Sequence, residues 1–434
     1  MAGTDTNVEI AAASPGQRSL WLAERYRGGG GLLSVPVLLR LRGPLDAVAL
    51  QQALDATVAH YESLRTTVEM RSRSLVQVIH PVAETPVPVE RPRAEIVPSG
   101  QAMAEVRGML QEEPDIRTCP IRAGLWQTGQ QEHIFALNVH HLVTDGWSNR
   151  LILSALGTAY SGLVAGQPVP LPPQDVRYAD YAAVAAGAAE DAEGQRLWAD
   201  ALRGADFARL PGPERERPAT VFRVRRQRPP ARHQEVAMAP ETMAGLRATA
   251  RQQRTTVFVL LLGAFMHALA TRTGQDELAI GSIFANRAKP ELHHTVGMFA
   301  TLSVLRAEVT GDPLAIASQL RRPVLAAITH QELHHGMLPL GTGAEVAHGA
   351  PSEAVFHMVA QPPGAPAAGQ FSGLDVTELT WPDRLASRFE LELVLAQREE
   401  SVAGLFRYAA DRLHEDWVAG LADRFTADVA AMAR

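Results

Sequence analysis

The alternation of apolar and polar positions predicts helices and strands throughout the chain. Apolar residues recur at helical spacing in some segments, and short apolar runs bounded by polar residues or proline have the character of strands in others. In the first half the predicted helices cover 15–27, 47–61 and 148–160, and the predicted strands cover 75–79 and 133–141. The second half has predicted strands near 233–238, 277–284, 354–360 and 388–397, and predicted helices at 241–252, from 256, near 313–334 and from about 415.

A proline-rich break separates these halves. Four prolines fall between residues 168 and 173, and the apolar pattern stops there. We place a boundary near residue 176, which gives an N-terminal lobe of residues 1–176 and a C-terminal lobe of residues 177–434. Helices and strands in both parts predict an α/β protein with mixed α+β sheets. Two such lobes commonly form their site in the cleft between them.

Bulk composition narrows the class of protein. The 434 residues are 46% hydrophobic and 20% charged, which is typical of a soluble globular protein, and the net charge of −6 argues against nucleic-acid and anionic-membrane partners. The longest apolar stretch, 257–270, is too short to span a bilayer, and the N-terminus lacks the order of a signal peptide. The single cysteine, Cys119, has no partner for an internal disulfide, so we expect a cytoplasmic protein. We also expect a monomer.

Two adjacent histidines lie in VHHLVTDGWS (139–148), where a predicted strand passes into a predicted helix. Consecutive side chains of a strand point to opposite faces, so His140 and His141 do not converge easily on one metal ion. The segment HQELH (330–334) does not match the zinc motif HExxH either, because its glutamate is the second residue after the first histidine and the motif requires the first. We therefore expect no metal site in either segment.

Two histidines that point to opposite faces of a strand can take different roles in acyl transfer. One imidazole is held inward, while its neighbour faces a cleft and accepts a proton from an incoming amine or alcohol. We expect Asp145, in a tight turn, to pair with an arginine, and Gly146 to offer its backbone N–H to a developing oxyanion at a helix N-terminus. No serine or cysteine stands in a nucleophile elbow such as GxSxG, so the pattern indicates acyl transfer without a covalent enzyme intermediate.

HHLVTDG (140–146) matches the HHxxxDG motif of the condensation domains of nonribosomal peptide synthetases, and further segments follow in that family's order. The resemblance covers roughly residues 14 to 430 and includes SPGQRSLW (14–21), HYESLRTTV (60–68), RYADYAAV (177–184), the A-N-R and G-x-F-x-N-T stretch (280–306) and HQEL (330–333). The chain departs from the family where asparagine, proline and tryptophan are expected, at Thr301, His334 and Val184.

The resemblance implies a fold and a set of residue roles. The fold would be two chloramphenicol-acetyltransferase-like lobes in a V-shaped pseudo-dimer, with the active site at their interface. His141 would act as base or would position the acceptor, His140 and Asp145 would be mainly architectural, and Gly146 would lie near the thioester carbonyl. Asp145 would pair with Arg287 of the A-N-R segment, and the substrate tunnel would be lined by Trp147, Ser148, Gly297 and Met298.

The resemblance also implies a substrate class. An acyl or aminoacyl group would pass from the phosphopantetheine thioester of a peptidyl or acyl carrier protein to an amine or alcohol. The acceptor would be a small molecule or carrier-bound, and the product would be an amide or ester in natural-product biosynthesis of the nonribosomal peptide type, antibiotics included. No bound cofactor is expected. The chain has the length of about one condensation domain and shows no adenylation or carrier motif, so we expect a freestanding enzyme.

Two alternatives stay open, a coenzyme A-dependent acyltransferase of the same fold and a catalytically silent recruitment module. The recruitment module is disfavoured because all four fixed positions of HHxxxDG are intact. Epimerisation is disfavoured because those relatives commonly continue with VSW, whereas this chain continues with Trp147-Ser148-Asn149. Cyclisation is disfavoured because those relatives replace both histidines with aspartates.

Overall fold

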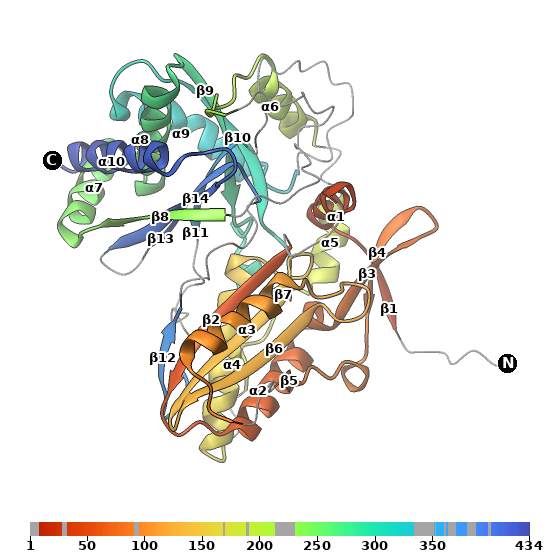
Figure 1. Ribbon diagram of the computed structural model, residues 1–434. Helices are drawn as coiled ribbons and strands as arrows, with labels where there is room; N and C mark the ends of the chain where they lie inside the picture. Colours follow the sequence, from red (N-terminus) through yellow and green to blue (C-terminus); the bar gives the residue numbers. More distant parts are fainter. Residues whose placement is uncertain are drawn as a thin grey trace.

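The structure is a computed structural model, and it describes residues 8–27, 33–90, 95–167, 170–187, 191–212, 231–333, 351, 353–359, 362, 370–379, 388–397 and 401–434. Within these residues the chain forms three β-sheets. The two larger sheets belong to two lobes, the lower and upper parts of Figure 1, and helices pack on each of them.

The first lobe is built on a five-stranded sheet in the order β12-β2-β7-β6-β5. Its strands are β2 (Ser34–Arg42), β5 (Val89–Glu90), β6 (Ile121–Gly129), β7 (Glu132–His140) and β12 (Asp375–Glu378). Because alternate strand residues point to opposite faces, one face packs on α2 (Ala47–His60) and α4 (Gly146–Val164), and the other on α3 (Ser99–Gln111). Strand β7 is therefore covered on both faces, and its end at His140 leads within a few residues into α4.

The second lobe is built on a six-stranded sheet in the order β10-β9-β11-β13-β14-β8. Its strands are β8 (Ala231–Met238), β9 (Glu277–Phe284), β10 (Thr301–Glu308), β11 (Ala354–Val359), β13 (Leu391–Gln397) and β14 (Val402–Ala409). The helices are α7 (Pro240–Gln252), α8 (Val257–Thr273), α9 (Pro313–Thr329) and α10 (Glu415–Met432). Helix α8 is apolar on nearly all sides, and it is buried against the sheet and its neighbouring helices.

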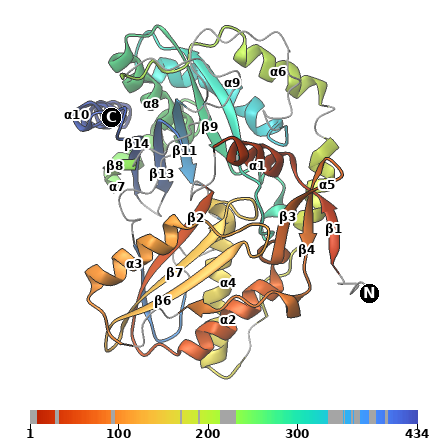
Figure 2. The same cartoon turned by 45° about the vertical axis from the view of Figure 1, so that its right-hand side comes forward.

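Further elements connect the lobes. A three-stranded sheet of β1 (Glu9–Ala12), β4 (Ser74–Ile79) and β3 (Thr66–Arg71) adjoins the first lobe, with helices α1 (Pro15–Arg27) and α5 (Tyr178–Ala186) nearby. Helix α6 (Ala192–Leu202) packs on β9 and β10 of the second lobe. In Figure 2, α1 lies where the two lobes meet. Strand β12 comes from the second half of the chain, yet it pairs with β2 and so completes the first lobe's sheet (Figure 1).

Mixed sheets were expected, and they are confirmed. Strand β5 pairs with β6 in parallel in the first lobe, and β11 pairs with β9 and β13 in parallel in the second, whereas the remaining pairs of both sheets are antiparallel. The boundary near residue 176 stays a prediction. Among the described residues, no single helix has the length and apolarity to cross a bilayer, and only the α7–α8 pair, bent by 104°, meets those criteria jointly.

The predicted elements are present, with some shifts at their ends. Helix α4 begins at Gly146 rather than at 148, because Asp145 caps it, and α9 ends at Thr329. Residues 334 and 360, which close a predicted helix and a predicted strand, lie outside the described residues. Strand β2 was not predicted, because Pro36 breaks its pattern, and β6 and β14 were missed because glycine and arginine interrupt their apolar runs.

Candidate active site

The end of β7 directs the two histidines differently. Strand residue His140 is buried, whereas His141, the next residue, lines a cavity between the lobes. His141 Nδ1 lies 2.7 Å from the carbonyl oxygen of Thr144, so Nδ1 carries the proton that this bond needs, and Nε2 keeps its lone pair. The alternation expected from the strand thus brings one imidazole to the cavity wall.

The cavity has a volume of about 240 Å³ and receives residues from both lobes. Helix α1 contributes Ser19 and Leu20, and the loop before β2 contributes Leu33. The second lobe contributes side chains from β9, β10, β11, β13 and β14. Most of the lining is apolar, with a few polar groups among it, which is the usual composition of a site for a small substrate.

Both histidines are held in the neutral form. Burial and the nearby Arg388 guanidinium lower the pKa of His141 to about 4. Burial lowers the pKa of His140 to about 3. At neutral pH the His141 ring is therefore uncharged, and its Nε2 can accept a hydrogen bond from an N–H or O–H group in the cavity.

Asp145 connects the histidine loop to the second lobe. Its Oδ1 accepts from the backbone N–H of Ser148 at 2.7 Å, which caps α4. Its Oδ2 accepts from the backbone N–H groups of Phe299 and Ala300 at 3.0 and 3.2 Å. With both oxygens occupied and only 1% of the residue exposed, Asp145 is placed to hold structure rather than to move a proton.

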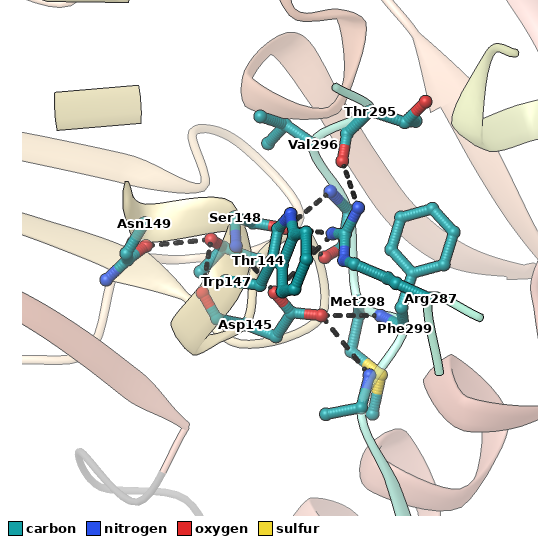
Figure 3. A network of polar contacts seen from close by, with 12 residues as sticks. Thr144, Asp145, Trp147, Ser148, Asn149, Arg287, Thr295, Val296, Met298 and Phe299 are labelled. Carbon is teal, nitrogen blue, oxygen red and sulfur yellow. Dashed lines mark hydrogen bonds and ion pairs between the residues drawn. The ribbon is translucent and has the colours of Figure 1, made fainter. Parts of the chain in front are cut away.

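Arg287 completes this junction, as Figure 3 shows. Its Nη2 lies 3.6 Å from Asp145 Oδ1 and donates to Ser148 Oγ at 2.7 Å. Its Nη1 donates to the carbonyl oxygens of Leu292 and Thr295 at 2.5 and 2.7 Å. The guanidinium carbon lies 4.0 Å from the ring centre of Phe299, a cation–π distance. The structure thus brings Asp145 and Arg287 together in a buried network.

The four residues expected in the tunnel divide into two pairs. Trp147 and Met298 line the cavity, whereas Ser148 and Gly297 do not. Ser148 Oγ donates to the carbonyl oxygen of Gly297 at 2.7 Å and accepts from its N–H at 3.1 Å. Ser148 and Gly297 therefore fasten α4 to the second lobe behind the cavity wall.

Gly297 is at a point of close approach. A Cβ atom there would lie 2.0 Å from Cδ2 of Tyr178, whose ring is buried and whose hydroxyl donates to the carbonyl oxygen of Met298 at 2.7 Å. We expect Gly297→Ala to lower the free energy of unfolding by about 1–3 kcal/mol through overpacking, measured by urea denaturation. Gly108→Ala is the matched control, because a Cβ on that exposed helical glycine meets nothing within 4 Å. Equal stability of the two variants would refute the close-packing argument.

Gly146 is the first residue of α4 and lines the cavity. A Cβ on it would meet Val359 Cγ1, in the second lobe, at 3.8 Å. The absence of a side chain keeps the positive end of α4 open toward the cavity, where backbone N–H groups favour a negative charge.

Sequence reasoning missed a charged group on the opposite wall. Arg388, His357, Glu392 and Arg407 line the cavity from the second lobe. A signal was present, because Glu392 alternates with leucines in a segment predicted as a strand, and a charged residue in such a strand marks the face away from the core.

Among the described residues, no group of three or more histidine, cysteine, aspartate or glutamate side chains could hold a metal ion. His334, the second histidine of the HQELH segment, lies outside the described residues.

Comparison with known proteins extends these observations. The sequence model of the condensation-domain family matches residues 7–434. The nonribosomal peptide synthetase agiA of Aspergillus flavus is 28% identical over 436 residues, which is 96% of this chain and 5% of that protein. Chondramide synthase cmdD of Chondromyces crocatus is 31% identical over 343 residues, 75% of this chain and 8% of that protein. The chain thus spans less than a tenth of the length of these relatives.

Solved structures show the same fold. The X-domain from teicoplanin biosynthesis matches with a TM-score of 0.78 at 23% identity, covering 100% of this chain and 96% of that one. The first condensation domain of the calcium-dependent antibiotic synthetase matches with a TM-score of 0.76 at 18% identity, covering 98% of this chain and 96% of that one. Both matches agree with a fold of two chloramphenicol-acetyltransferase-like lobes. With the family pattern matched over nearly its whole length, the chain belongs to the condensation-domain family.

Proposed function

We propose that this chain transfers an acyl or aminoacyl group from a carrier-protein phosphopantetheine thioester to an amine or alcohol, forming an amide or ester in nonribosomal peptide-type biosynthesis. The observation that carries the proposal is the position of His141. Its neutral ring lines the cavity between the lobes, and Nδ1 is committed to the Thr144 carbonyl oxygen. Nε2 is then the atom that meets the acceptor nucleophile.

The proposed reaction is a direct displacement at the thioester carbonyl. The acceptor lone pair forms the new bond to the carbonyl carbon, and the carbon–sulfur bond breaks. His141 Nε2 accepts a hydrogen bond from the attacking N–H or O–H, and that proton finally passes to the leaving thiolate. The N-terminus of α4 at Gly146 faces the oxygen that becomes negative. Asp145 and Arg287 hold the histidine loop in a fixed position against the second lobe.

An open groove of about 850 Å³ supports entry of a carrier-bound arm. It shares Ile283, Phe284, Ala285 and Met358 with the cavity, so the two spaces adjoin. Exposed Arg321 and Arg322 also line the groove. A phosphopantetheine arm carries a negative phosphodiester at its protein end, and arginine is well suited to bind phosphate. The groove is thus the proposed approach of the carrier protein, and no bound cofactor is required.

Two other functions remain candidates on this fold. A coenzyme A-dependent acyltransferase would use the same cavity, since coenzyme A presents its acyl group on a pantetheine thiol as well. A recruitment module is favoured by one solved structure, a complex of the teicoplanin X-domain with OxyB. The open His141 Nε2 in a lined cavity favours catalysis. We further propose that the enzyme is a monomer and that it works in the cytoplasm, because its single cysteine can form no internal disulfide.

Transfer from loaded carriers tests the proposal. The pure protein is incubated with an acyl group on a carrier protein, on coenzyme A or on pantetheine, each with amine and alcohol acceptors, and products are identified by mass. We expect turnover with the carrier at the lowest KM. Turnover with acyl-coenzyme A but not with acyl-carrier would establish the coenzyme A alternative, and no turnover with any donor would favour recruitment.

A double charge reversal sharpens this test. Arg321→Glu with Arg322→Glu should raise KM for the acyl-carrier about tenfold or more, because each lost charge-assisted contact costs roughly 1.5–3 kcal/mol. The same variant should not change KM for the acyl-pantetheine, which lacks the phosphate. Equal effects on both donors would place the carrier elsewhere.

A further inference from the structure

A second histidine lines the active cavity, from the lobe opposite the histidine loop. His357 lies in β11, and its neighbours on either side, Phe356 and Met358, pack on the core of the second lobe. Consecutive side chains of a strand alternate between faces, so His357 points to the other face of the sheet, and it lines the cavity. The cavity therefore receives two imidazole rings, His141 from the first lobe and His357 from the second.

A buried carboxylate lies beside the ring of His357. Glu392, on the neighbouring strand β13, is 1% exposed. Burial acts to raise its pKa, but contact with the His357 ring and two nearby guanidinium groups outweighs burial and lowers the pKa of Glu392 to about 2. These guanidinium groups belong to Arg407 and Arg388. The carboxylate is therefore ionised at neutral pH.

The two oxygens of this carboxylate face different partners. Glu392 Oε2 lies 3.5 Å from Arg407 Nη1, and Oε1 lies 3.7 Å from His357 Nδ1. The second distance is that of an ion pair rather than a hydrogen bond, and such catalytic contacts often tighten only when substrate is bound. A carboxylate at Nδ1 orients an imidazole and stabilises the imidazolium that forms during proton transfer. With Nδ1 on the side of Glu392, Nε2 is the nitrogen of His357 that is left for the cavity.

The sheet register places His357 where a carrier-bound arm would enter. Ile283 of β9 is the direct cross-strand partner of His357, and Met358 is the next residue of β11. Both Ile283 and Met358 line the groove as well as the cavity, so the passage between the two spaces runs beside His357. The sulfur of the thioester is the last atom of the arm. It would reach the cavity on the side of His357.

His357 is also near the start of α4. Val359 lies on the same face of β11, two residues and roughly 6–7 Å further along the strand. Its Cγ1 would be 3.8 Å from a Cβ on Gly146. A thioester whose carbonyl oxygen faces Gly146 thus shares one cavity of about 240 Å³ with both imidazole rings. His141 is then the ring for the acceptor, and His357 is the ring for the sulfur.

We propose, on the basis of the proposed function, that His357 is a second catalytic residue, which Glu392 orients and whose Nε2 gives a proton to the leaving sulfur. The acceptor lone pair forms the bond to the carbonyl carbon, and the acceptor's proton goes to His141. The carbon–sulfur bond breaks, its electron pair stays on sulfur, and sulfur takes the Nε2 proton of His357. His141 then releases one proton to solvent and His357 regains one from solvent. The net transfer of a proton from acceptor to thiol is unchanged.

Donors that differ in the acidity of their thiol test this role. Single-turnover rates are measured for one acyl group on pantetheine and on trifluoroethanethiol, with the same amine acceptor. Trifluoroethanethiol is the more acidic thiol, so its thiolate leaves faster and without help from an acid. We expect His357→Gln to slow transfer from acyl-pantetheine about 10²-fold, the lower end of the range for general acid catalysis. Transfer from the trifluoroethyl thioester should slow by no more than a few-fold.

Two further variants separate catalysis from packing. Glu392→Gln keeps the size of the side chain and removes its charge, so it should show the same dependence on thiol acidity with a smaller loss. His414→Gln, at an exposed histidine just before α10, is the control that should change neither rate. The two rates are compared within one preparation. A partly unfolded variant therefore slows both donors equally and leaves their ratio unchanged.

Each outcome bears on a different proposal. Equal slowing of both donors in His357→Gln, or no slowing of either, would overturn the acid role of His357 and leave the proposed function standing. A loss in Glu392→Gln that is the same for both donors would overturn the orienting role of Glu392. Failure of the wild-type protein to transfer an acyl group from any donor, the loaded carrier included, would overturn the proposed function itself.

Discussion

Replacing His141 with alanine should slow product formation by about 10²- to 10⁴-fold, the range typical of a lost general base or nucleophile-orienting group. The reason is geometric. His141 lines the cavity and keeps Nε2 free of the Thr144 hydrogen bond, whereas its buried neighbour His140 does not reach the cavity. The measurement is the single-turnover rate with a saturating donor and acceptor. A rate within a factor of a few of wild type would refute the assignment, provided that the variant melts as the wild type does.

The pH dependence of the same rate checks the charge state of His141. Its pKa is lowered to about 4, so the ring is neutral throughout the range above that value. Protonation removes the lone pair on Nε2, so the loss that it causes should begin only as the pH falls toward 4. In Arg388→Gln, loss of the nearby positive charge should raise the pKa of His141 and move this decline to higher pH. A decline centred near pH 6.5 in the wild type would show an ordinary exposed histidine instead.

The histidine loop was largely predictable because the interactions that shape it join residues close together in the sequence. Strand alternation separates His140 from His141, an aspartate before a glycine-led apolar helix is a suitable N-cap, and both relations depend on residues close in sequence. The partners of Asp145 are not local. That its carboxylate binds the backbone at Phe299 and Ala300 follows only from the packing of the two lobes.

The opposite cavity wall shows the same limit. The strand that carries Glu392 was predicted, and its alternation could be read from the sequence, but the cavity that it faces forms only where the two lobes meet. Strand β12 is a stronger case, because DVTE is a short polar sequence whose partner β2 lies more than 300 residues earlier. Nothing local distinguishes such an edge strand from a loop, since its stability comes from backbone pairing.

Arg287→Ala should be strongly destabilising, with a loss of about 3–5 kcal/mol in the free energy of unfolding. A buried ion pair adds little net stability, since desolvation of both charges offsets their attraction. Removal of one partner is different, because it leaves the other charged and unpaired. Here Asp145 would keep its negative charge in a site that is 1% exposed, and the carbonyl oxygens of Leu292 and Thr295 would lose the hydrogen bonds that Arg287 donates.

Denaturation midpoints and a double-mutant cycle separate this cost from a general loss of packing. Arg203→Ala, an exposed arginine paired with Asp200, should change stability by no more than about 0.5 kcal/mol. Asp145→Ala should also destabilise, because it removes the cap of α4 and the acceptor for Phe299 and Ala300. If the two charges depend on each other, the double variant will lose less than the sum of the single losses. Strict additivity would mean that Arg287 acts through its backbone and aromatic contacts alone, and that the ion pair between the lobes contributes nothing.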